Sequence, residues 1–263
     1  MTLLRLPATH TPAIPAGRTD AVLLDFDHTL AHLGSFVRWE DARRTLLPLY
    51  GAGGVPEAFL ERHPGALDLY GQVAISELLA DAGIREAHRQ ASLALAAFEA
   101  EAVPRTRLTP GAVAVLRRLP ALGLPTGIVS SNAAPVVAAV LERERVSSAF
   151  GAIVGRDDVA RLKPAPEGLL KCCAALGVRP GRCIYVGDSV SDIKAARAAG
   201  MTGFGVVGGM ASADELVAAG AEAVVDDLAR LLSLIEGAKL PGRCRRVPGE
   251  ASPQSNGEVR TVP

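Results

Sequence analysis

Short apolar runs recur along the chain after residue 20, and longer segments whose apolar positions return every three or four residues separate them. The short runs are rich in β-branched residues, which indicates buried strands. They span residues 21–26, 125–130, 151–155, 183–188, 202–207 and 221–227. The longer segments are rich in Ala and Leu, and several stop at a glycine, as helices commonly do. This alternation predicts an α/β fold, with a doubly wound (Rossmann-like) parallel sheet that helices cover on both faces.

One long segment departs from this alternation. Between about Leu33 and Thr106 the pattern is helical throughout and contains no convincing strand. We therefore expect residues 33–106 to form a smaller all-helical domain, inserted into an α/β core made of residues 20–32 and 107–237. Residues 1–19 are predicted to be a flexible segment. Residues 238–263, rich in Pro, Gly, Ser and charge, are predicted to be a disordered tail.

Composition narrows the possible partners of this 263-residue chain. It carries 28 Lys and Arg against 28 Asp and Glu, so its charge favours neither nucleic acid nor an anionic membrane as a partner. No apolar run approaches the roughly 20 residues that span a bilayer. The four cysteines show no metal-binding spacing and are predicted to be reduced thiols of a cytoplasmic protein, either a monomer or a homodimer. These cysteines are Cys172, Cys173, Cys183 and Cys244.

Polar side chains collect where the predicted strands end. In a parallel sheet these ends share one edge, where open α/β folds bind their ligands. The residues placed there are Asp25, Asp27, Ser130, Ser131, Asn132, Lys163, Asp188 and Asp192. Burying an unpaired carboxylate costs several kcal/mol in practice, so a group of aspartates at this edge requires a cation or hydrogen-bond donors. The pattern predicts a site of that kind.

Four short motifs occur in order on these strand ends: DFDHTL, IVSS, LKPAPE and VGDSVSD. Together they resemble the haloacid dehalogenase-like hydrolase superfamily over about residues 20–236. The flanking segments LTPGAVAVLRRLPALG and AARAAGM are similar to its phosphoglycolate phosphatase-like branch. The resemblance implies that the helical insert is a cap domain placed after the first motif.

The resemblance also implies a role for each motif residue. Asp25 would attack phosphorus and form an aspartyl-phosphate, and Asp27 would act as general acid and then as general base. Lys163 and Ser130, with Ser131 and Asn132 beside it, would bind the phosphoryl group. The implied cofactor is Mg²⁺, held by Asp25, Asp188 and the Asp27 carbonyl, with Asp192 orienting Lys163 or metal-bound water.

The resulting prediction is a Mg²⁺-dependent phosphatase that hydrolyses a small phosphorylated metabolite, a phosphoglycolate-like phosphomonoester. Asp27 favours phosphate esters over carbon–halogen bonds, because a dehalogenase has no alkoxide to protonate. Two alternatives stay open: a sugar-phosphate mutase of the same superfamily, and a non-catalytic protein-binding module on this fold.

Several positions near the first motif carry no assigned role. His28 replaces the glycine common in this motif, and His32 replaces an acidic residue. Histidine tolerates a positive φ, so the turn is expected to survive and both histidines to be structural. The first helix of the insert contains Arg38, Trp39, Arg43 and Arg44. One of these arginines would either meet a second anionic group of the substrate or belong to a solvated basic face.

Overall fold

A six-stranded parallel sheet forms the centre of the protein, in a computed structural model that describes residues 19–239. The strands are β1 (Ala21–Leu24), β2 (Thr126–Val129), β3 (Ala152–Val154), β4 (Cys183–Gly187), β5 (Thr202–Val206) and β6 (Ala223–Val225). Their order across the sheet is β3-β2-β1-β4-β5-β6, and every neighbouring pair is parallel. All six predicted strands are present, and the predicted doubly wound α/β fold is confirmed.

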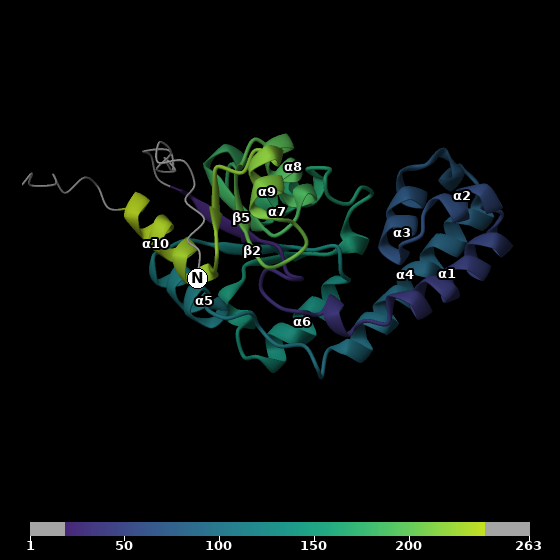
Figure 1. The fold of residues 1–263 in the computed structure, drawn as a ribbon, viewed down its shortest axis with the longest axis horizontal. Coiled ribbons are helices and arrows are strands. Elements are labelled where there is room, and N and C mark those ends of the chain that lie inside the picture. Colours follow the sequence, from purple (N-terminus) through teal and green to yellow (C-terminus); the bar gives the residue numbers. More distant parts are fainter. Residues whose placement is uncertain (1–18, 240–263) are drawn as a thin grey trace, which may run out of the picture.

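Helices cover both faces of this sheet because alternate residues of a strand point to opposite sides. Val22 and Leu24 pack into a core with α5, α6 and α10, whereas Ala21 and Leu23 pack against α7 and α8. Figure 1 shows α7, α8 and α9 on one side of the strands and α5 and α6 on the other. The bounds of these helices are α5 (Ala112–Ala121), α6 (Ala134–Arg143), α7 (Glu167–Leu176), α8 (Val190–Ala198), α9 (Ala213–Ala219) and α10 (Leu228–Lys239). Short 3-10 helices are η3 (Ser147–Ala149), η4 (Arg156–Asp158) and η5 (Pro180–Arg182).

Most of the segment between β1 and α5 is helical, and its helices α1 to α4 lie together at one end of the molecule (Figure 1). Its elements are η1 (Gly34–Phe36), α1 (Trp39–Gly53), α2 (Glu57–Arg62), α3 (Ala66–Ile75), η2 (Glu77–Ala80) and α4 (Ala82–Ala102). We call α1 to α4 the helical insert. It has an apolar core of its own, which includes Leu46, Leu69 and Leu95. The chain enters and leaves it side by side, since Ala31 and Leu108 form an antiparallel bridge.

Three of the cysteines, Cys172, Cys173 and Cys183, are buried free thiols, as predicted. Cys244, nearly all of the predicted tail and nearly all of the predicted N-terminal segment lie outside the described residues. Among the helices within residues 19–239, none combines the length and apolar character that crossing a membrane requires.

Candidate active site

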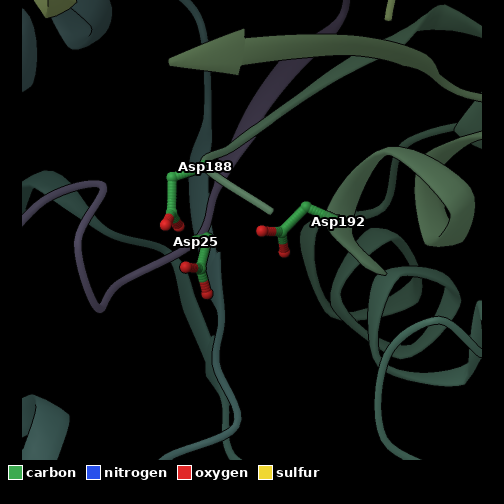
Figure 2. Close-up of side chains that lie close together, drawn as sticks. All are labelled: Asp25, Asp188 and Asp192. Atoms are coloured by element: carbon green, nitrogen blue, oxygen red, sulfur yellow. The ribbon is translucent and has the colours of Figure 1, made fainter. Parts of the chain in front are cut away.

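Three carboxylates meet at the carboxyl end of the sheet, where the strand order reverses between β1 and β4. Asp25 follows β1, Asp188 follows β4, and Asp192 lies in the first turn of α8. An oxygen of each lies within 4.8 Å of an oxygen of the other two, and the three side chains point toward one another in Figure 2. All three are buried, and the exposure of Asp25 is 5%. The sheet thus gathers negative charge in a place that water barely reaches.

Lys163 supplies the opposing charge from the loop that precedes α7. Its Nζ donates to Asp25 Oδ1 at 2.5 Å, to Asp192 Oδ1 at 2.7 Å and to the Tyr185 hydroxyl at 3.2 Å. Tyr185 stands in β4 and itself donates to Asp192 Oδ1 and to the carbonyl of Val129. The lysine is therefore held on Asp25 by a network that spans three strands.

The burial of these groups sets their protonation. Burial raises the pKa of Asp25 well above its ordinary value, with Lys163 lowering it and the neighbouring Asp192 and Asp188 raising it further. Burial and Asp192 likewise raise the pKa of Asp188. Burial lowers the pKa of Lys163, but Asp192 and Asp25 together raise this pKa above its ordinary value. The ammonium of Lys163 therefore stays charged. One ammonium does not balance three carboxylates, so negative charge exceeds positive charge among these four side chains, and a bound cation would offset the excess.

Asp192 and Asp188 differ in how their oxygens are occupied. Asp192 accepts from Lys163 and Tyr185 on Oδ1, and from the backbone N–H and hydroxyl of Ser189 on Oδ2. Among the residues that the structure describes, Asp188 accepts one donor on each oxygen, the Thr29 hydroxyl at 3.2 Å and the Met210 N–H at 2.7 Å. A carboxylate has about four lone-pair positions, so Asp188 keeps capacity for a further ligand and Asp192 is already saturated.

Asp27 lies at the boundary between the core and the helical insert. Its Oδ1 accepts from the N–H of Gly34 at 2.9 Å. A β-carbon on Gly34 would lie 2.2 Å from Asp27 Oδ2, so only glycine permits this approach. His28 adopts φ 60°, which confirms the expected left-handed turn, and its Nε2 lies 3.9 Å from Asp27 Oδ2. The short helix η1, which leads into the helical insert, therefore begins at the residue that holds the Asp27 carboxylate.

The loop after β2 presents Ser130, Ser131 and Asn132 to the same edge. The hydroxyl of Ser130 donates to Asn132 Oδ1 at 3.0 Å and accepts from the Asn132 N–H at 3.1 Å. The Asn132 amide donates to Glu99 Oε1 at 3.0 Å, and the Ala133 N–H donates to Glu99 Oε2 at 3.0 Å. Helix α4 of the insert therefore anchors this loop.

Arg156 balances the charge of Glu99. Its Nη1 donates to Glu99 Oε1 at 2.7 Å and to the carbonyl of Ser131 at 3.2 Å. Both side chains are 0% exposed. Beside this pair, Tyr70 of α3 donates to Asp157 at 3.3 Å and Ser92 of α4 also donates to Asp157. These contacts tie the insert to the core next to the Ser130 loop.

The aspartates, Lys163 and the loop after β2 line one cavity of about 310 Å³, which we call the site cavity. It is lined by Asp25, Asp27, His28, Trp39, Leu67, Ser130, Ser131, Asn132, Lys163, Asp188, Ser189, Ser191, Asp192 and Met210. Every residue predicted for the site is in this set. His32 instead lines a separate cavity of about 200 Å³, which His28 borders as well.

The arginines of the first insert helix are not part of the site cavity. Arg38 pairs with Asp41 and Glu101 on the surface, and Arg44 pairs with Asp41. Arg43 donates to the carbonyls of Leu60 and His63 within the insert. Of the two alternatives left open for these arginines, the exposed pairs of Arg38 and Arg44 favour the solvated basic face.

Three residues that organise the site were missed from the sequence: Glu99, Arg156 and Tyr185. A signal existed for Glu99, which continues the apolar stripe of α4 formed by Ala91, Leu95 and Ala102. A carboxylate on such a stripe indicates a buried partner. Tyr185 interrupts the apolar run of β4 in the same way.

The comparisons with known proteins agree with this geometry. Residues 19–200 match the family of haloacid dehalogenase-like hydrolases. The parallel sheet with Asp25 and Asp188 after its adjacent strands β1 and β4, and with Lys163 on the loop before α7, agrees with a hydrolase of this class, and the chain belongs to that family.

Two further comparisons describe its relatives. The phosphoglycolate phosphatase of Escherichia coli (strain K12) is 39% identical over 104 residues, which are 40% of this chain and 41% of that protein. The chain thus spans about two fifths of the length of the curated relatives it matches. A hydrolase from Pseudomonas syringae (TM-score 0.60, 23% identity) covers 82% of this chain and 98% of its own. A phosphonoacetaldehyde hydrolase-like protein from Oleispira antarctica (TM-score 0.59, 24% identity) covers 85% and 93%. Both structures share the fold.

Proposed function

We propose that the protein is a Mg²⁺-dependent phosphatase that hydrolyses a small phosphomonoester through an aspartyl-phosphate. The observation that supports this most is the position of Asp25. One of its oxygens receives Lys163, Asp188 lies within ligand distance, and the Ser130 loop lines the same cavity. A nucleophile, a positive charge and hydrogen-bond donors around one cavity are what phosphoryl transfer requires.

The donor set fits Mg²⁺. Asp25 and Asp188 are buried carboxylates with raised pKa values and a shortage of positive charge around them. Such hard oxygen donors suit a small divalent cation. Asp25, Asp188 and the main-chain carbonyl of Asp27 would hold the ion, which would neutralise charge on the phosphoryl oxygens. The saturated Asp192 would instead keep Lys163 in place.

In the first step, a carboxylate oxygen of Asp25 attacks phosphorus and the bond from phosphorus to the ester oxygen breaks. Asp27, oriented by the N–H of Gly34, gives its proton to the departing oxygen. In the second step, Asp27 takes a proton from water as that water attacks phosphorus, which frees Asp25 and releases inorganic phosphate. Lys163 and the hydroxyl of Ser130 bind the phosphoryl oxygens in both steps.

The test is phosphate release from a panel of phosphomonoesters, with Mg²⁺ and with a chelator. Phosphoglycolate, after which the relatives are named, is the reference compound. We expect release that requires Mg²⁺ and that Asp25→Asn abolishes, because the amide is not a nucleophile. Asp214→Asn is the matched control, because it makes the same exchange at an exposed position of α9, and it should leave turnover unchanged.

Two outcomes contradict the proposal. Turnover that survives Asp25→Asn overturns the covalent mechanism. An isomerised sugar phosphate without phosphate release identifies a mutase instead.

A further inference from the structure

The wall that the helical insert contributes to the site cavity is apolar. Trp39 of α1 and Leu67 of α3 line it from the insert, and Met210 lines it from the loop after β5. Met210 is 74% exposed at the opening of this cavity. The methionine side chain is flexible and can adapt to ligands of varied shape at the opening of the site cavity.

Trp39 presents only its ring surface to the site cavity. Its indole N–H already donates to the carbonyl of Gly34 at 3.0 Å, so the polar atom of the side chain is occupied within the chain. The N–H of the same Gly34 donates to Asp27. Trp39 and the proposed general acid Asp27 therefore both bind Gly34, and both line the site cavity.

The charges of the site cavity disfavour a second anionic group on the substrate. Among the described residues that line it, Lys163 is the one Lys or Arg side chain, and Asp25 and Asp192 already engage it. A substrate carboxylate beside Trp39 would share the cavity with Asp27 and three further aspartates. The remaining basic side chain of the lining is His28, whose Nε2 already lies 3.9 Å from Asp27 Oδ2. Leaving a charge desolvated without a partner costs several kcal/mol.

We infer that the leaving group of the substrate is an uncharged alcohol with apolar surface, which contacts Trp39 and Leu67. This inference rests on the proposed phosphatase function and narrows it. Phosphomonoesters that carry a carboxylate on the leaving group, phosphoglycolate included, are then poor substrates. The cavity of about 310 Å³ lies at the small end of ligand sites and suits a leaving group the size of one ring.

The experiment compares two substrates with the same bond to break: benzyl phosphate and 4-carboxybenzyl phosphate. We expect the kcat/KM of benzyl phosphate to exceed that of its carboxylated partner by about tenfold or more. Equal values, or a preference for the carboxylated ester, overturn the inference.

A positive charge introduced at Leu67 should largely remove this preference. Leu67→Lys keeps an aliphatic stem against the insert and places an ammonium at the site cavity. We expect the ratio of the two kcat/KM values to fall by about tenfold in this variant, a gain that misfolding does not produce. Leu93→Lys is the matched control and should keep the wild-type ratio. Leu93 lies on α4, is 56% exposed and does not line the site cavity. A wild-type ratio in Leu67→Lys contradicts the placement of the leaving group.

Binding can be measured without turnover, because Trp39 is the one tryptophan of the sequence. Benzyl phosphate added to Asp25→Asn with Mg²⁺ should change the tryptophan fluorescence saturably, with an affinity about tenfold above that of 4-carboxybenzyl phosphate. If no phosphomonoester is hydrolysed by the wild type, the proposed function fails. The titration still decides the inference in that case, since equal affinities or an unchanged fluorescence overturn it.

Discussion

The buried pair of Glu99 and Arg156 gives the sharpest prediction about stability. We choose Glu99→Gln, which keeps the shape of the side chain and removes its charge. In the native protein four N–H donors point at this carboxylate: Nη1 and Nη2 of Arg156 at 2.7 and 3.4 Å, Asn132 Nδ2 at 3.0 Å and the Ala133 N–H at 3.0 Å. A glutamine offers one acceptor to these donors and turns an N–H group toward the rest.

The expected loss follows from the burial of the pair. Both side chains are 0% exposed, and breaking a buried ion pair from one side costs about 3–5 kcal/mol. Asp157 lies 3.9 Å from Arg156 Nε and is partly exposed, so it compensates only part of the stranded charge. We therefore expect Glu99→Gln to lower the free energy of unfolding by about 3 kcal/mol, the lower end of that range.

The assay is urea unfolding followed by circular dichroism, with Glu101→Gln as the matched control. Glu101 lies on the same helix, is 61% exposed and pairs with Arg38. An exposed ion pair contributes about 0–1 kcal/mol, so the control should change little. At a temperature where Glu99→Gln is folded, we also expect a lower kcat, because the Ser130 loop loses its anchor. A loss below about 1 kcal/mol in Glu99→Gln, or equal losses in both variants, would refute this reasoning.

Other predictions concern the carboxylates of the site. Gly34→Ala should lower kcat by about 100-fold, because its β-carbon displaces the Asp27 carboxylate, whereas Gly51→Ala, with open space around it, should not. Asp188→Asn should weaken the apparent affinity for Mg²⁺, measured from the metal dependence of phosphate release, and high Mg²⁺ should restore part of the activity. The increase in Tm that Mg²⁺ produces should shrink as the pH falls toward 3.8. The raised pKa values of Asp25 and Asp188 make protons compete with the metal above that pH. A rise in Tm that is independent of pH would contradict this assignment of ligands.

The amino-acid pattern was enough to predict the sheet and the set of residues at its edge. Apolar runs separated by helical periodicity predicted all six strands, because burial on both faces leaves a local pattern in the chain. The four motifs brought Asp25, Ser130, Lys163 and Asp188 to one cavity, as observed, since parallel strands end on the same edge. The catalytic roles assigned to them stay predictions.

Which side chains of the helical insert face this cavity could not be predicted from the local pattern, because it depends on how the helices pack. Trp39 lines it and its neighbours Arg38 and Arg43 do not, although all three lie at or near the start of α1. The pairing of Glu99 with Arg156 joins residues 57 positions apart on two different units. Local periodicity places a residue on the face of its own helix. What that face meets depends on packing between distant segments, and that packing selected the contacts of this site.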